Sequence, residues 1–168
     1  MRKAKDFRVE LGSTAKCLVT GFTGMVVAAA QWLFNCNTYV VKPRALYKGK
    51  PIEGEQIEGP VLKVVKPPKD VMVDEWPFLI KLGSEAKDDI TGFSGLVICR
   101  TRWLASCNTY TVQPQELKDG KVQDTMVFTE ERLTVTKDPE PEEEEAIERS
   151  RNTGGPTPPI VHADGRSV

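Results

Sequence analysis

The side chains best suited to chemistry lie in a short phrase that the chain contains twice. Cys-Asn-Thr-Tyr begins at Cys36 and again at Cys107, 71 residues later. In each copy an amide, Asn37 or Asn108, could bind a ligand, and the thiol could bridge neighbouring chains. The same residues also suit a structural turn, because Asn tolerates the left-handed backbone region and Cys packs as a small apolar residue. Both interpretations stay open from the sequence.

Motifs of the common catalytic sites are missing from the sequence. It contains no G-x-S-x-G, H-E-x-x-H, P-loop or G-x-G-x-x-G. We interpret the adjacent carboxylates Asp88 and Asp89 as a solvated turn. The four cysteines form no C-x-x-C pair, and the single histidine, His162, lies far from them in the sequence, which argues against a zinc site or a thiol–imidazole pair. We therefore predict no enzyme, no cofactor and no metal site.

A tandem repeat organises the elements that position these side chains. The stretch from Leu11 aligns without gaps on the stretch from Leu82, and the register extends to Leu62 over Leu133. The composition changes where this register ends. The predicted organisation is a first repeat at 1–65, a linker at 66–77, a second repeat at 78–136 and an acidic, proline-rich extended tail at 137–168.

Each repeat is predicted to be built from short β-strands. A strand precedes the glycine turn TGFTG or TGFSG, a long apolar strand covers 25–33 in the first copy, and a third strand ends at Pro43 or Pro114. Two more strands are expected near the end of the second copy. Tyr39 and Tyr110 recur on the apolar side of the third strand and are expected to face the core. Five short strands of this kind favour a small barrel over a β-sandwich.

The alternation of side chains along the long strand predicts which face is buried. Positions of the parity that includes Trp32 and Trp103 are mostly apolar and are expected to point inward. Positions of the other parity include Arg100 and Arg102 and are expected to point outward. The alternative is that the two tryptophans are half-exposed platforms for a ligand.

A family resemblance is carried by the pattern K..VTGF.G.V.....WL..CNTY.V.P..L..GK. It resembles small SH3-like barrel proteins encoded by bacteriophages and prophages, and its glycine turn is similar to that of KOW and Tudor-like barrels. The resemblance covers 11–65 and 82–136. It implies an all-β fold of two tandem small SH3-like barrels followed by the tail. The sequence departs from KOW-type nucleic-acid binders in having few basic residues on the turns of the first copy.

Charge and hydropathy limit the classes of function. The 23 basic and 24 acidic residues nearly cancel, so there is no chain-wide basic field of the kind that nucleic-acid binders carry. No apolar run approaches the ~20 residues that span a bilayer. The first residues, MRKAKDFRVE, do not form a secretory signal. We expect a soluble protein made in a reducing cytoplasm, with free thiols and without a disulfide between Cys17 and Cys99.

Three classes of function remain. The first is a phage structural protein of the virion, such as a capsid cement or decoration protein or a head–tail accessory, made in the host cytoplasm and bound to neighbouring protein subunits. The second is an intracellular phage-encoded module that sequesters a small ligand or inhibits a host protein. The third, and weakest, is a nucleic-acid-binding accessory protein, whose basic residues would be Lys16, Lys42, Lys87, Arg100 and Arg102.

The tail contributes one further expectation to the first class. Its acidic run followed by Gly and Pro cannot form a core of its own, so we expect it to be mobile in the free protein. The apolar cluster of Pro159, Ile160 and Val161 is short enough to fill a pocket on a neighbouring subunit. The tail is therefore predicted to be an assembly arm.

Overall fold

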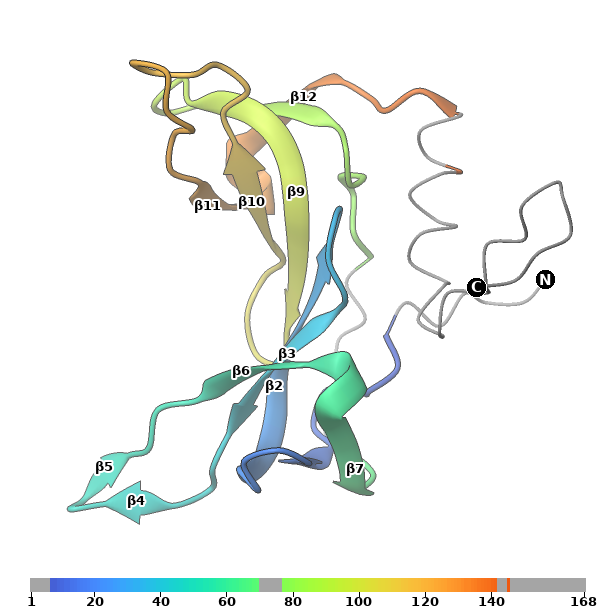
Figure 1. Cartoon of the computed structure of the whole chain (residues 1–168), viewed down its shortest axis with the longest axis vertical. Helices are drawn as coiled ribbons and strands as arrows, with labels where there is room; N and C mark the ends of the chain where they lie inside the picture. Colours follow the sequence, from blue (N-terminus) through green and yellow to red (C-terminus); the bar gives the residue numbers. More distant parts are fainter. Residues whose placement is uncertain (1–6, 70–76, 142–144, 146–168) are drawn as a thin grey trace, which may run out of the picture.

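The structure, a computed structural model, describes residues 7–69, 77–141 and 145 and is almost entirely β (Figure 1). This confirms the all-β prediction. Most of the predicted linker and tail, including Pro159, Ile160 and Val161, lies outside the described residues. Among the described residues, no helix has the length and apolar character that crossing a membrane requires.

The strands of the two repeats correspond one to one. The first repeat contains β1 (Thr14–Cys17), β2 (Thr23–Trp32), β3 (Thr38–Lys42), β4 (Leu46–Tyr47), β5 (Lys50–Pro51), β6 (Glu55–Glu58), the 3-10 helix η1 (Gly59–Val61) and β7 (Leu62–Lys66). The second contains β8 (Glu85–Asp88), β9 (Ser94–Trp103), β10 (Thr109–Gln113), β11 (Met126–Thr129), the 3-10 helix η2 (Glu130–Arg132) and β12 (Leu133–Lys137). A single isolated bridge takes the place of β4 and β5 there. Every other element begins and ends 71 residues after its counterpart.

Within each repeat the strands pair in the same antiparallel order. The first repeat runs β7-β1-β2-β3-β6, and the second runs β12-β8-β9-β10-β11. The strands β4 and β5 form a separate two-stranded hairpin. In each repeat four strands therefore form a meander, with one hairpin arm inserted between the third and the fourth, and the fifth strand returns to pair with the first.

The two repeats are joined into one sheet, which corrects the predicted architecture of separate closed barrels. The second halves of β2 and β9 pair antiparallel, so that ten strands form one continuous sheet among the described residues. Ala30 pairs with Thr101, its own counterpart 71 residues later. The junction thus has the geometry of an isologous interface with a pseudo-two-fold axis. We call this contact, Ala28–Trp32 against Cys99–Trp103, the junction. The sheets do not close into barrels.

A β-bulge in each long strand overturns the predicted orientation of the arginines. The register of β2 against β3 shifts between Val26 and Ala28, and β9 shifts in the same way against β10. One extra residue reverses the alternation that follows it. Val26 and Ala29 consequently share one core, although their positions have opposite parity. Arg100 and Arg102 of β9 therefore point to the face of the sheet that packs on the aromatic rings. Trp32 and Trp103 lie on the opposite face.

The tryptophans are half-buried rather than central to the core. The indole N–H of Trp32 donates to Thr38 Oγ1 at 2.9 Å, and that of Trp103 donates to Thr109 Oγ1 at 3.0 Å. Across the junction, Trp32 lies opposite Cys99 and Trp103 lies opposite Ala28. Ala28, Ala30 and Cys99, which lie on the same face, are buried.

Each repeat has its own core, and each core receives a side chain from the other repeat. Leu33, which follows β2, is buried with the apolar residues of the second repeat. Leu104, which follows β9, packs against the core of the first. Their backbone N–H groups continue the junction ladder, to Ile98 O and Val27 O, both at 2.8 Å. The two repeats therefore stabilise each other through reciprocal packing.

The glycines of the repeated turn serve two different purposes. Gly21 adopts a φ of 76°, as expected from the sequence. Gly24 instead makes room for the neighbouring strand, because a Cβ there would lie 2.5 Å from the backbone of Lys42. At Gly95 the corresponding distance, to Gln113 O, is 2.1 Å. The close approach of β3 to β2, and of β10 to β9, thus requires glycine at this position.

Candidate functional site

The asparagines of the repeated phrase support the fold around the 3-10 helices. The backbone carbonyl of Asn37 accepts from Gly59 N at 2.8 Å, and that of Asn108 accepts from Glu130 N at 3.2 Å. The side chain of Asn108 is 3% exposed and donates through Nδ2 to Pro77 O at 3.2 Å. Through these backbone hydrogen bonds, Asn37 and Asn108 hold the first residue of η1 and of η2 in place.

The tyrosines of the same phrase lie in the cores, as predicted. The hydroxyl oxygen of Tyr39 accepts from the backbone N–H groups of Arg8 and Val9 at 3.1 and 3.3 Å. Tyr110 donates its hydroxyl proton to Glu130 Oε2. Burial raises the pKa of Tyr110 above its ordinary value, and the carboxylate of Glu130 adds to this effect. Tyr39 therefore anchors the segment that precedes β1, and Tyr110 anchors the first residue of η2.

The predicted candidates Arg100 and Arg102 come together at the junction. Arg100 donates through Nε to Gln31 Oε1 at 2.7 Å and stacks on Phe78, with Cζ 4.6 Å from the ring centroid. Arg102 lies over the same ring at 4.8 Å and over Phe7 at 5.7 Å. Both guanidinium groups are half-buried. They cover aromatic rings within the protein, an arrangement that cation–π attraction stabilises.

The carboxylate Asp88 is also part of the fold, which corrects its interpretation as a solvated turn. Its side chain is fully buried and forms a bidentate pair with Arg132, from Nε to Oδ1 at 2.9 Å and from Nη2 to Oδ2 at 2.8 Å. Thr91 N also donates to Oδ2, at 2.8 Å. Hydrogen bonding from Arg132 holds the pKa of Asp88 well below its usual range. The first repeat has Cys17 and Val61 at the two positions of this ion pair.

The thiols differ in their access to solvent. Cys17 and Cys99 are buried, Cys36 is half-buried and Cys107 is exposed. Burial raises the pKa of Cys99 to about 11 and also raises the pKa of Cys36. A hydrogen bond from Thr20 lowers the pKa of Cys17. All four are free thiols in this structure.

We predict that alkylation at neutral pH modifies Cys107 first and Cys99 last. Cys99 is shielded by its neighbours, and its raised pKa leaves a thiolate fraction about a hundredfold smaller than that of an ordinary cysteine. Peptide mapping after timed treatment with iodoacetamide measures the order. Early labelling of Cys99 in the folded protein, or a recovered peptide linking Cys17 to Cys99, would contradict the prediction.

The most exposed structural feature is the pair of hairpin arms, one from each repeat. The first arm is residues 42–52, and the second arm is residues 113–123. Each tip is a two-residue turn with positive φ at both positions, 49° and 76° at Lys48 and Gly49, and 52° and 72° at Asp119 and Gly120. This is the type I′ geometry that suits the twist of antiparallel strands. The first arm projects from one end of the molecule (Figure 1).

Bulky apolar side chains on the first arm face solvent. Leu46 and Tyr47 are each 67% exposed. The ammonium group of Lys48 lies 5.3 Å from the centroid of the Tyr47 ring. Because the arm is only a two-stranded hairpin, the rest of the fold does not cover these side chains.

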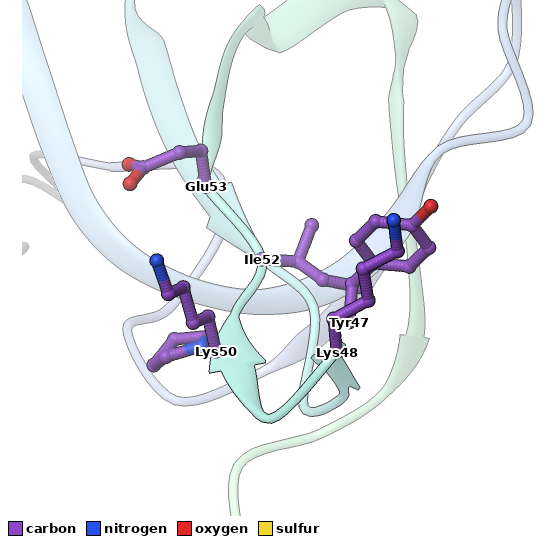
Figure 2. Close-up of a pocket in the computed structure, with 6 residues that line it drawn as sticks. Tyr47, Lys48, Lys50, Ile52 and Glu53 are labelled. Carbon is purple, nitrogen blue, oxygen red and sulfur yellow. The ribbon is translucent and has the colours of Figure 1, made fainter.

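A hollow of about 680 Å³ lies against the first arm. Its lining residues are Tyr47, Lys48, Lys50, Pro51, Ile52 and Glu53. Figure 2 shows Lys48 beside the ring of Tyr47, Ile52 directed toward the same side, and Lys50 on the other side of the hairpin. The volume lies within the range of ligand sites in proteins. Its lining combines apolar side chains with the ammonium groups of Lys48 and Lys50 and the carboxylate of Glu53, so that its net charge is positive, which suits a segment that is both apolar and anionic.

The two arms differ in charge although they share their backbone design. The first arm contains Lys42, Arg44, Lys48 and Lys50 and no acidic residue, whereas the second arm has two lysines balanced by Glu116 and Asp119. Within the described part of the chain, none of the four cations of the first arm forms a salt bridge. The first arm thus presents uncompensated positive charge next to exposed apolar surface.

Sequence reasoning missed this arm. The expectation of few basic residues on the turns of the first copy does not hold for the β4–β5 hairpin, which has Lys48 in its turn and Lys50 directly after it, at the start of β5. A usable signal was present in the phrase YKGK, because a Lys-Gly pair between short strands is compatible with a type I′ turn.

Comparison of the chain with protein-family models, curated proteins and solved structures finds no match.

Proposed function

We propose that the protein is a non-enzymatic structural component of an assembly, and that its first arm binds a neighbouring protein subunit. The observation that carries this proposal is the exposure of Leu46 and Tyr47 on a projecting hairpin, beside four cations that form no salt bridge within the described residues. Exposed aromatic and apolar anchors surrounded by charge are typical of protein interaction sites. The resemblance to phage proteins suggests that the assembly is a virion.

The use of polar groups elsewhere supports a role in binding rather than catalysis. Asp88 is neutralised by Arg132, Asn108 is bonded to backbone, and Tyr110 is paired with Glu130. Asp88 and Tyr110 would otherwise be the natural candidates for acid–base chemistry. Arg132 and Glu130 belong to the same repeat, and Pro77 is the last residue of the predicted linker; these contacts hold the strands and the 3-10 helix η2 together.

We infer further that each repeat is an open relative of the SH3-like unit. The strand order β7-β1-β2-β3-β6, with a 3-10 helix between β6 and β7, supports this inference. In this proposal the junction replaces barrel closure, and it holds the two arms of one molecule in fixed positions. A rigid body with two arms suits a component that links neighbours in a lattice.

Substitution of the first-arm anchors is expected to reduce incorporation into the assembly by about tenfold or more, since loss of one anchor side chain commonly costs at least about 1.4 kcal/mol of binding. The variant is Leu46→Ser with Tyr47→Ser. Quantitative mass spectrometry of particles purified from the source that encodes the chain gives the measurement.

The second arm provides a matched control for this experiment. Leu117→Ser with Val122→Ser removes two exposed apolar side chains from the equivalent hairpin and is expected to leave incorporation within about twofold of normal. Stoichiometric presence of the unmodified protein supports the proposal. Its absence from particles, or equal losses with both variants, would contradict it.

A further inference from the structure

The acidic segment that follows the second repeat matches the first arm in charge. Residues 138–148 contain seven carboxylates and no lysine or arginine. The first arm contains four cations and no carboxylate. The second arm, with two cations and two carboxylates, offers no such match. Complementary potentials of this kind favour one pairing and disfavour others.

The segment also matches the hollow beside the arm in its apolar content. Ile147 is its one bulky apolar side chain, and it follows directly after the run of four glutamates at 142–145 and Ala146. The hollow offers Tyr47 and Ile52 beside Lys48 and Lys50, with Glu53 as its single carboxylate. An acidic segment of this composition could therefore place carboxylates on the lysines and its isoleucine against the apolar side chains.

The position of the two surfaces points to contact between molecules. The described chain leaves the second repeat at the end of β12, at Lys137. Figure 1 shows β12 at one end of the molecule and the β4–β5 hairpin at the other. A contact between these two different surfaces is heterologous, so repetition of it produces an open chain or a ring rather than a closed dimer.

We propose that the first arm binds the acidic segment 138–148 of a second copy of this chain, so that copies associate head to tail. This inference rests on the proposed function, because it names the neighbour that the first arm contacts. The four cations have no carboxylate partner within the described part of their own molecule. The segment of a second copy carries seven carboxylates, of which Glu140 and Glu145 already have an interaction within their own molecule. The contact is largely electrostatic and is therefore sensitive to salt.

Sedimentation velocity of the full chain tests the proposal. In about 0.1 M NaCl the protein is expected to form species larger than a monomer that grow with concentration. In about 1 M NaCl these should dissociate, because the Debye length falls from about 10 to about 3 Å. A monomer at all concentrations in low salt would overturn the proposal.

Charge variants identify the two surfaces. Lys48→Glu with Lys50→Glu should weaken association by about tenfold or more, as should replacement of Glu142, Glu143, Glu144 and Glu145 by Gln. The control, Lys118→Glu with Lys121→Glu, alters two lysines of the second arm and should leave association unchanged. Unaltered association of either test variant would overturn the proposal.

A mixture of the two test variants gives the most specific outcome. The arm variant retains a functional acidic segment, and the glutamine variant retains a functional arm. Mixed together they should form 1:1 pairs that cannot extend, whereas the unmodified protein extends further. Failure of the mixture to associate would overturn the proposal.

Two further outcomes separate this inference from the proposed function. A monomeric protein whose first-arm anchors are still needed for incorporation would overturn self-association and leave the arm as a binding site for another protein. A monomeric protein whose Lys48 and Lys50 instead bind a fluorescent single-stranded oligonucleotide would overturn both proposals.

Discussion

Replacement of Leu33 by Ala is expected to destabilise the second repeat, although Leu33 belongs to the first. Its side chain is 5% exposed and packs in the core formed by residues of the second repeat. Truncation of a buried leucine costs about 2–5 kcal/mol through lost burial and the cavity left behind. Hydrogen–deuterium exchange at β8–β12 should therefore accelerate, and the urea midpoint of unfolding should fall.

The neighbouring residue provides a control for this experiment. Phe34 follows Leu33 directly and is 85% exposed, so Phe34→Ala is expected to change stability by no more than about 0.5 kcal/mol. The reciprocal variant, Leu104→Ala, should loosen the first repeat. Effects of Leu33→Ala that stay within the first repeat would show that the cores do not exchange side chains.

Loss of Arg132 is expected to be strongly destabilising, because it leaves the buried carboxylate of Asp88 without its cation. The first repeat shows what an apolar pair looks like at the same place, with Cys17 and Val61. The double substitution Asp88→Cys with Arg132→Val transfers that pair to the second repeat. We expect Arg132→Val alone to lower the urea midpoint far more than the double variant does.

The same ion pair predicts how stability depends on pH. The pKa of Asp88 is lowered in the folded protein, chiefly by Arg132, so the unfolded chain binds the proton more tightly. The stabilisation is complete above the ordinary aspartate pKa of about 3.9 and is lost as the pH falls below it. Urea midpoints at about pH 7 and about pH 3 should therefore differ more for the unmodified protein than for the double variant. Equal differences would contradict this assignment.

The repeat and its strands could be predicted because they depend on local pattern. The turn glycines, the apolar run and the strand-ending prolines of each copy fix the strands, and the ungapped register fixes their correspondence. The core positions of Tyr39 and Tyr110 also followed from comparing the copies. These features require only alternation and turn chemistry, both of which a sequence shows directly.

The junction could not be predicted in this way because it joins strands far apart in the sequence. Pairing of β2 with β9 depends on which edge of each long strand remains open. The bulge at Val27 inverts the parity argument, and nothing in the phrase MVVAAA marks it. Simple alternation, which ignores the bulge, predicts Arg100 and Arg102 at the outer surface. They instead lie over Phe7 and Phe78.

The first arm was missed for a different reason. A two-stranded hairpin of two residues on each side shows too little alternation to be recognised as strands. Its charge becomes informative only when it is compared with the second arm at the same register. There Lys42 and Arg44 become Gln113 and Gln115, and Lys48 becomes Asp119.

The claim that the first arm is the binding surface is tested most directly by hydrogen–deuterium exchange of the protein, free and within its assembly. A bound partner excludes water from the hairpin and slows its opening. We predict slower exchange at 46–52 in the assembly, with exchange at the equivalent residues 117–123 unchanged. Unchanged exchange at 46–52, together with protection elsewhere in the chain, would contradict the assignment of the first arm as the interaction site.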